Sequence, residues 1–181
     1  MLADAQLGAS LSQAPRLSYA GFAARIVPPT YYRTPLSCEG SGKKSGRYHV
    51  RGTVEVLYLA DTLFTALYEI GGAIDVGERI FDVPITPRHL VSVVCRRLEN
   101  LVDLTAPDLQ ALFGTSLQEL TGAWAPYADR GPAPTQRFGL AAYHSGVAGM
   151  RVPSAARTSA SNYVLFCERF NEDNLRVFES T

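Results

Sequence analysis

Residues 54–72 read VEVLYLADTLFTALYEIGG, and this stretch decides the fold that the sequence predicts. Within this stretch Val54, Val56 and Tyr58 alternate with Glu55, Leu57 and Leu59. Such a run, rich in β-forming side chains, is typical of a strand buried on both faces. Asp61 or Thr62 then caps a helix that ends at Gly71-Gly72. The apolar residues of that helix recur at three- and four-residue spacing: Leu63, Ala66, Leu67 and Ile70. Glu69 lies off this apolar face, so the helix presents one carboxylate elsewhere.

The residues before this strand are basic, aromatic and rich in glycine. Tyr31-Tyr32-Arg33 precede a turn, SGKKSGRY, at 41–48. This order suits a pocket for an anionic nucleotide, and the simpler alternative is a basic loop that links two elements. The turn is not a P-loop, because Lys44 follows Gly42-Lys43 and the position five before Gly42 is Ser37. It also misses the dinucleotide fingerprint by one position and precedes a strand, so a bound hydride-carrying cofactor is not expected.

The rest of the chain mixes short strands and helices without a repeat. Strands are predicted at 80–85, 90–98, 149–152, 162–170 and 175–178, the first two as a hairpin or an adjacent pair around Pro87. Helices are predicted over 105–113, from the Ser116 and Glu119 capping box to Gly122, and from Thr135 through Tyr143.

Strands at both ends with helices between them predict an α+β fold. At 181 residues and 46% hydrophobic content, the chain is long enough for one well-buried core. We therefore expect a single domain over 19–181. Residues 1–18 are expected to form either a short helix or a flexible N-terminal segment.

Composition and charge narrow the function classes. The 17 basic and 17 acidic residues cancel, which argues against direct binding to nucleic acid or to an anionic membrane. No basic residue precedes the first apolar stretch, and no apolar run approaches the roughly 20 residues of a membrane span, so a cytoplasmic protein is expected. Cys38, Cys95 and Cys167 are odd in number and far apart, which argues against a disulfide framework.

Two kinds of site find no support in the sequence. His49, His89 and His144 have no partner at metal-ligand spacing, so no metal is expected. The chain also lacks the Gly-x-Ser-x-Gly elbow that would expose a serine nucleophile.

The segments that remain resemble together the RES domain, the toxin component of bacterial Xre-RES toxin-antitoxin modules. They are Tyr31-Tyr32-Arg33, the turn at 46–48, the strand at 56–60, the helix with Glu69, and residues 149–154 and 162–166. The resemblance runs from about Tyr31 to Phe166. The Arg, Glu and Ser that name the family correspond to Arg33, Glu69 and Ser154.

This chain departs from the family pattern in two places. The family usually shows a Gly-Gly-Arg-Trp-Asn turn where this chain has Ser45-Gly46-Arg47-Tyr48-His49. Tyrosine retains the aromatic ring, and histidine in place of asparagine is expected to alter a hydrogen bond in the turn. The segment 100–136 also makes the interval before Ser154 longer than in a compact member.

The resemblance implies a fold similar to the diphtheria-toxin-like ADP-ribosyltransferases and an enzyme that degrades NAD by cleaving its nicotinamide-ribose bond. NAD is then a substrate, and no cofactor is implied. Cleavage of an N-glycosidic bond develops positive charge on the ribose, which a nearby carboxylate stabilises. Glu69 is the expected carboxylate, and Ser154 would position it or the ribose.

Four further residues are expected to bind the dinucleotide. The guanidinium groups of Arg33 and Arg47 match a diphosphate, and Tyr48 and Tyr58 offer flat faces to the bases or the nicotinamide. Each residue also has a structural alternative. Glu69 is then a solvated surface residue, Arg33 pairs with a carboxylate, Tyr58 lies in the core, and Arg47 and Ser154 close turns.

The sequence leaves two other functions open. One is mono-ADP-ribosylation of a host protein, and the other is a catalytically silent module that binds a nucleotide or a partner. The resemblance implies a cognate Xre-like antitoxin, with a DNA-binding domain, that covers the pocket. The oligomeric state stays open, a homo-oligomer included.

Overall fold

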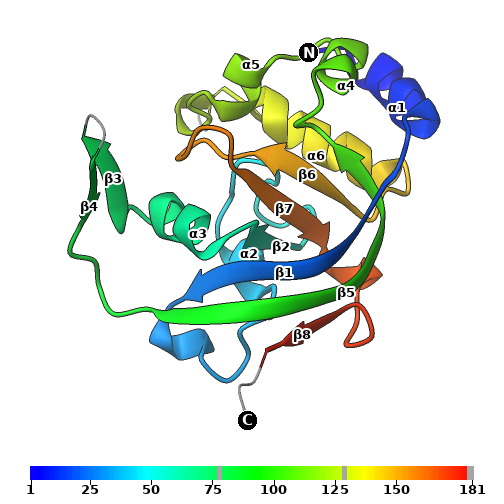
Figure 1. Ribbon diagram of the computed structural model, residues 1–181. Coiled ribbons are helices and arrows are strands. Elements are labelled where there is room, and N and C mark those ends of the chain that lie inside the picture. Colours follow the sequence, from blue (N-terminus) through cyan, green and yellow to red (C-terminus); the bar gives the residue numbers. More distant parts are fainter. Residues whose placement is uncertain (77–78, 128–129, 179–181) are drawn as a thin grey trace.

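One curved sheet organises the molecule (Figure 1), and the computed structural model describes residues 1–76, 79–127 and 130–178. The strands of this sheet are β1 (Leu17–Val27), β2 (Val56–Ala60), β5 (His89–Asp103), β6 (Gly149–Pro153), β7 (Ser161–Phe166) and β8 (Leu175–Val177). Their order is β1-β2-β7-β6-β5-β8, and β1 also pairs with β5. The first five strands therefore close into a ring, with β8 added to β5. The predicted α+β class is confirmed.

The strands next to the candidate site are buried on both faces. In β7, Val164 and Phe166 pack into one hydrophobic cluster while Tyr163 and Leu165 pack into the other. The neighbouring β2 does the same, with Val56 in the first cluster and two leucines in the second. Full burial of a side chain of this size contributes about 1.5–3 kcal/mol. The alternation at 54–59 thus predicted the environment of this strand correctly.

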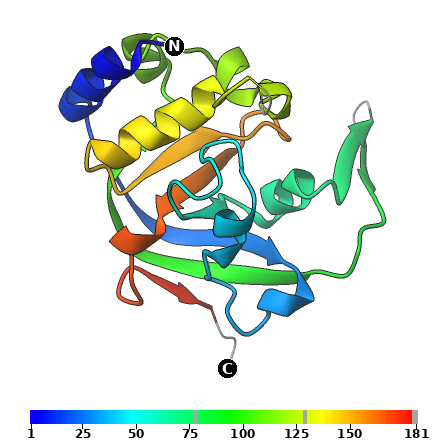
Figure 2. The same cartoon turned by 180° about the vertical axis from the view of Figure 1, so that it is seen from behind.

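Four helices cover one end of the sheet. They are α1 (Asp4–Gln13), α4 (Pro107–Leu112), α5 (Leu117–Thr121) and α6 (Pro134–His144). Seen from behind, α6 lies across β6 (Figure 2). Leu7 and Leu11 of α1 are fully buried in the cluster beneath these helices, so the N-terminal residues take the helical alternative.

The start of α6 differs from the prediction. Ala133 occupies the N-cap position and Pro134 the first turn, so Thr135 lies inside the helix instead of capping it. The Ala133 amide donates to Oε1 of Gln136 at 2.9 Å. Proline tolerates the first turn because its missing N–H needs no partner there.

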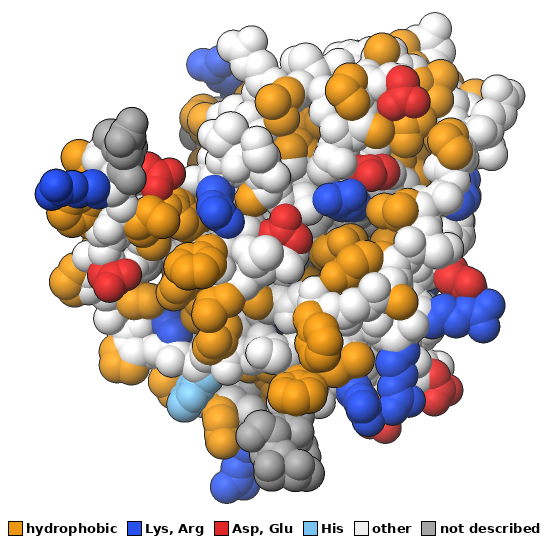
Figure 3. All heavy atoms as spheres, in the orientation of Figure 1, with side chains coloured by type: hydrophobic (Ala, Val, Ile, Leu, Met, Phe, Trp, Pro, Cys, Tyr) orange, Lys and Arg blue, Asp and Glu red, His pale blue; other side chains and the backbone are white. Residues whose placement is uncertain are grey.

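A short helix and a hairpin extend from the opposite side of the ring. They are α3 (Leu63–Glu69), β3 (Ala73–Val76) and β4 (Arg79–Asp82), while α2 (Glu39–Lys43) precedes β2. β4 pairs with β3 and not with β5, so the hairpin predicted around Pro87 is wrong. Hydrophobic side chains gather on the surface over β3 and β4 (Figure 3), among them the half-exposed Ile74 and Phe81.

The cysteines also differ from the prediction. Cys38 and Cys167 form a disulfide, with Cα atoms 6.4 Å apart and a sequence separation of 129. The expectation that no disulfide forms is therefore wrong. The pairing follows from the sheet, which places the end of β7 beside the segment before β2, and spacing along the chain does not reveal it. Cys95 is free, and burial raises the pKa of its thiol to about 12.

None of the helices in the described ranges combines the length and the apolar character that crossing a bilayer requires.

Candidate functional site

Helix α3 places Glu69 at its last position. Thr62 caps the helix, because its Oγ1 accepts a hydrogen bond from the Thr65 amide at 3.1 Å. Gly71, at φ +70°, reverses the chain after Glu69, and its amide donates to the Tyr68 carbonyl. The buried face is formed by Thr65, Ala66 and Tyr68. The predicted apolar face is therefore only partly correct, and Leu63 is exposed.

Glu69 is held through a single carboxylate oxygen. Its Oε1 accepts one hydrogen bond from the Ser154 hydroxyl at 2.7 Å and another from Nδ2 of Asn162 at 2.6 Å. Within the described residues, no hydrogen bond or ion pair involves Oε2. The carboxylate is thus fixed in direction by one oxygen, and the other remains available for a ligand.

The Ser154 hydroxyl has a defined orientation. Its Oγ accepts the amides of Ala156 and Arg157 at 3.2 and 3.1 Å. Because these two donors occupy its lone pairs, its single proton points to Glu69. Ser154 is only 6% exposed. This geometry makes it a rigid donor to Glu69, and the structure thus brings together two of the residues selected from the sequence.

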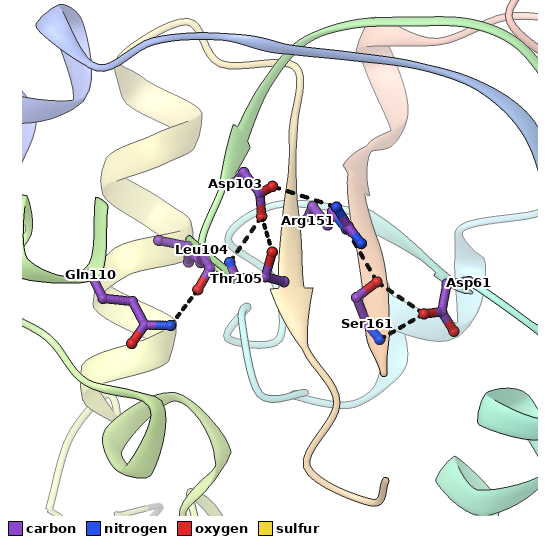
Figure 4. Close-up of polar contacts among 7 residues, drawn as sticks. All are labelled: Asp61, Asp103, Leu104, Thr105, Gln110, Arg151 and Ser161. Carbon is purple, nitrogen blue, oxygen red and sulfur yellow. Dashed lines mark hydrogen bonds and ion pairs between the residues drawn. The ribbon is translucent and has the colours of Figure 1, made fainter. Parts of the chain in front are cut away.

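A polar network ties the start of α3 to the sheet (Figure 4). One oxygen of Asp61 accepts the Thr65 hydroxyl at 2.6 Å, and the other accepts the amide and the hydroxyl of Ser161 at 2.9 and 3.1 Å. Ser161 and Asn162 are consecutive residues of β7. This strand therefore restrains α3 near its beginning through Asp61 and at its end through Glu69.

The network continues across the sheet to β5. Nε of Arg151 donates to the Ser161 hydroxyl at 3.2 Å, and Nη1 lies 3.5 Å from Oδ2 of Asp103 (Figure 4). The other oxygen of Asp103 accepts the amide and the hydroxyl of Thr105 at 2.9 and 2.6 Å. Hydrogen-bonded side chains thus link β5, β6 and β7 to α3.

The glycine-rich turn is closed by a buried histidine. Nε2 of His49 lies 3.1 and 2.9 Å from the carbonyl oxygens of Ser41 and Lys44, so it carries the proton. Nδ1 then accepts the Tyr58 hydroxyl at 3.1 Å, and that hydroxyl accepts the Tyr48 amide at 3.1 Å. Burial lowers the pKa of His49 from its usual value.

The two aromatic rings of this region differ in their burial. Tyr48 is 1% exposed and packs into the cluster under α6, and its hydroxyl has no hydrogen-bond partner in the described part of the chain. Burial raises the pKa of Tyr58 well above its usual range, and the negative charge of Glu69 adds to this effect. Tyr58 is only partly buried, while Tyr48 presents no open face to solvent.

The two arginines selected from the sequence differ in their surroundings. Nη1 of Arg47 donates to the carbonyl oxygens of Leu120 and Gly122 at 3.2 and 2.5 Å, and so ties the turn to the end of α5. Arg33 is exposed, and no side-chain hydrogen bond or ion pair links it to another described residue. Neither arginine forms a hydrogen bond or an ion pair with Glu69.

Asn162 was given no role from the sequence, and Asp61 was considered only as a possible cap of the helix. Asn162 belongs to the segment 162–166 that supports the family resemblance, and a polar residue there interrupts an otherwise buried strand. That interruption was the available signal. The described residues contain no group of His, Cys, Asp and Glu side chains arranged to hold a metal ion.

Comparisons with known proteins add two findings. The family model of the RES domain matches residues 23–177. A chain in the crystal structure of the M. tuberculosis MbcT-MbcA toxin-antitoxin complex has a similar fold, with a TM-score of 0.72 and 18% sequence identity. The similarity covers 96% of this chain and 90% of that chain. No curated protein matches the sequence.

Proposed function

Because this chain belongs to the RES domain family, we propose that it is the toxin of a toxin-antitoxin pair and that it degrades NAD by cleaving the nicotinamide-ribose bond. One observation carries the proposal: Ser154 and Asn162 hold Glu69 through Oε1 alone. A carboxylate with one fixed and one available oxygen is suited to stabilise positive charge on a bound ligand.

The proposed reaction needs such a carboxylate. When the bond between ribose C1′ and the nicotinamide nitrogen breaks, nicotinamide leaves with the electron pair and C1′ gains oxocarbenium character. Oε2 of Glu69 stabilises that charge directly or by orienting the ribose hydroxyls. A water molecule, a phosphate or a protein side chain then bonds to C1′, and a likeness to diphtheria-toxin-like ADP-ribosyltransferases forms part of the same proposal.

The other selected residues fall into two groups in this proposal. Arg33 contacts the dinucleotide, because its exposed guanidinium has donors to offer. Arg47, Tyr48 and Tyr58 act chiefly by holding the turn at 46–49 in place. A binding role for Tyr48 requires the turn to open, whereas Arg47 and Tyr58 are already partly exposed.

Nicotinamide release from NAD by the purified protein tests the proposal. We expect turnover in the wild type and a loss of about 10²–10³-fold in Glu69→Gln, because the neutral amide cannot stabilise the developing charge. Glutamine retains an oxygen that accepts the Ser154 and Asn162 hydrogen bonds, so the fold should persist. Arg33→Ala should raise KM, and Glu172→Gln, at an exposed position beside β8, is the matched control. Unchanged turnover in both Glu69→Gln and Arg33→Ala would overturn the proposal.

The acceptor of ADP-ribose is a separate question. Labelled NAD incubated with a cell lysate distinguishes hydrolysis or phosphorolysis from transfer to a protein, since only the latter leaves label on a protein band. Tight NAD binding without any product would instead favour a silent binding module.

The proposed partner is an antitoxin that covers the site. The structure with the similar fold is that of a toxin-antitoxin complex, which supports this part of the proposal. Expression of this chain alone should arrest growth of a bacterial host through loss of cytoplasmic NAD, and Glu69→Gln should not. Co-expression of the neighbouring reading frame should restore growth if that frame encodes the antitoxin.

A further inference from the structure

A cavity of about 460 Å³ lies beside the Ser154–Glu69 pair. The end of β5, helix α5, strand β6 and the loop between β6 and β7 line it. Ser154 belongs to both the cavity and the pair, since its hydroxyl bonds to Glu69. The cavity has the size of a small-molecule site.

The lining of this cavity suits an anion. It contains Arg151 and Arg157 and no Asp or Glu. The remaining polar lining consists of hydroxyl side chains: Thr105, Thr121, Ser154, Thr158, Ser159 and Ser161. Thr105, Thr121, Ser154 and Ser161 already donate their hydroxyl protons to other groups. The donors that phosphoryl oxygens can accept are therefore the two guanidinium groups and the hydroxyls of Thr158 and Ser159.

Arg157 is fixed in place without being neutralised. Its amide donates to Oγ of Ser154, and its guanidinium carbon lies 5.6 Å from the centre of the Tyr68 ring. Tyr68 directly precedes Glu69, so the guanidinium lies on the α3 side of the cavity. No ion pair links Arg157 to a carboxylate in the described part of the chain. A cation over an aromatic ring keeps its in-plane donors for a ligand.

Arg151 approaches the cavity from β6. Asp103 and Ser161 hold it through Nη1 and Nε (Figure 4). Its side chain is 37% exposed, and within the described residues Nη2 has no partner. The charge of Asp103 is shared with the Thr105 amide and hydroxyl, so the ion pair orients Arg151 and leaves donors for a second anion.

We propose that Arg157 and Arg151 bind the diphosphate of a nucleotide in this cavity. Two guanidinium groups from different elements suit a ligand with two linked phosphoryl groups better than a ligand with a single carboxylate. The identification of this nucleotide as NAD rests on the proposed function. In NAD the reacting ribose is joined to the diphosphate through its 5′ carbon, so a diphosphate site must lie close to the carboxylate that acts on C1′. Ser154 supplies that proximity here.

Calorimetric titration of the full-length protein with ADP and with adenosine tests the inference. We expect Arg157→Ala to weaken ADP binding by about 10–100-fold, the loss of one or two charge-assisted hydrogen bonds, and to leave adenosine binding unchanged. The ADP affinity of Arg157→Lys should lie between those of the wild type and Arg157→Ala. Arg176→Ala, at an exposed position on β8, is the matched control and should bind ADP as the wild type does.

Arg151→Ala should show the same selective loss, and thermal unfolding checks that its network has not collapsed. Three outcomes overturn the inference: no ADP binding by the wild type, wild-type ADP affinity in Arg157→Ala, or equal losses for ADP and adenosine. The same proteins, assayed for nicotinamide release, should show a raised KM for NAD with kcat nearly unchanged. Selective ADP binding without any nicotinamide release would overturn the proposed function and leave the anion site standing.

Discussion

The turn at 46–49 and the end of helix α3 lie in the same stretch of sequence but use their polar groups in opposite ways. In the turn, the ring of His49 and the hydroxyl of Tyr58 are bonded to backbone groups and to each other. At the end of α3, Glu69 keeps one oxygen without a partner among the described residues. Polar groups that are all hydrogen-bonded stabilise the local fold, whereas a carboxylate oxygen without a partner can interact with a ligand.

The difference sets which measurement should respond to a change in each region. Substitutions in the turn should lower the free energy of unfolding before they alter turnover. Substitutions around Glu69 should lower turnover while the protein stays folded. The predictions below test this division, beginning with the largest expected effect.

The closest approach in the turn region is at Gly139 of α6. A Cβ at this position would collide with the Tyr48 carbonyl oxygen and lie 2.9 Å from its carbon. We expect Gly139→Ala to lower the free energy of unfolding by about 3 kcal/mol, measured by urea denaturation, because backbone atoms must move. Gly8→Ala in α1, where a Cβ meets nothing within 4 Å, is the control and should stabilise by up to about 1 kcal/mol. Equal effects would contradict the close contact.

Tyr48 of the turn and Tyr58 of β2, which is hydrogen-bonded to it, give a matched pair. Tyr58→Phe leaves the Tyr48 amide and Nδ1 of His49 without partners, so we expect a loss of about 2 kcal/mol in unfolding free energy. Tyr48→Phe removes a buried hydroxyl that has no partner in the described residues, so stability should stay equal or rise. A larger loss in Tyr48→Phe than in Tyr58→Phe would show that the assignment is reversed.

The donors to Glu69 are expected to affect turnover. Asn162→Ala removes one hydrogen bond to Oε1 and should lower kcat for nicotinamide release by about tenfold with little change in the unfolding midpoint. Ser154→Ala also frees the amides of Ala156 and Arg157, so it should lower both kcat and stability, the latter by about 1 kcal/mol. A wild-type kcat in both variants would show that turnover does not need the two hydrogen bonds to Oε1 of Glu69.

The smallest effect expected is a dependence of stability on pH through His49. Burial lowers the pKa of this histidine in the folded protein, so the unfolded chain takes up the proton first as the pH falls. The contribution of neutral His49 to the free energy of unfolding is therefore complete above the pKa of histidine in the unfolded chain, about 6.5, and is lost as the pH falls below that value. One proton limits the slope to about 1.4 kcal/mol per pH unit. Urea midpoints from pH 7.5 to 5 should fall less steeply in His49→Gln, and identical slopes would count against this account.

Local patterns in the sequence predicted local structure well. The alternation at 54–59 and the Thr62 cap gave β2 and α3, because both depend on neighbouring residues. Ser116 caps α5 as expected, with its Oγ accepting the Glu119 amide at 3.2 Å. The Glu119 carboxylate differs from a capping box, since it accepts the Thr115 hydroxyl instead of returning to the cap.

Pairings between distant residues could not be predicted in the same way. The partner of β4, the Cys38–Cys167 bond and the burial of Tyr48 all depend on where the sheet brings separate segments together. The pair of Glu69 and Ser154 was found only through the family resemblance, since their sequence separation is 85. Asn162 was missed because an amide in a strand has no chemical signature until its partner is known.

The position of β7 in the ring also bears on how the protein is made. The two hydrogen-bond donors to Glu69 are Ser154 and Asn162, which follow it in sequence by 85 and 93 residues. Synthesis proceeds from the N-terminus, so a ribosome must translate beyond Asn162 before β7 can insert between β2 and β6. A nascent or truncated chain that ends before Ser161 therefore has the Glu69 carboxylate but lacks strand β7 and the Asn162 donor that helps to hold it. The order of the strands therefore delays assembly of the proposed active site until β7 has been synthesised.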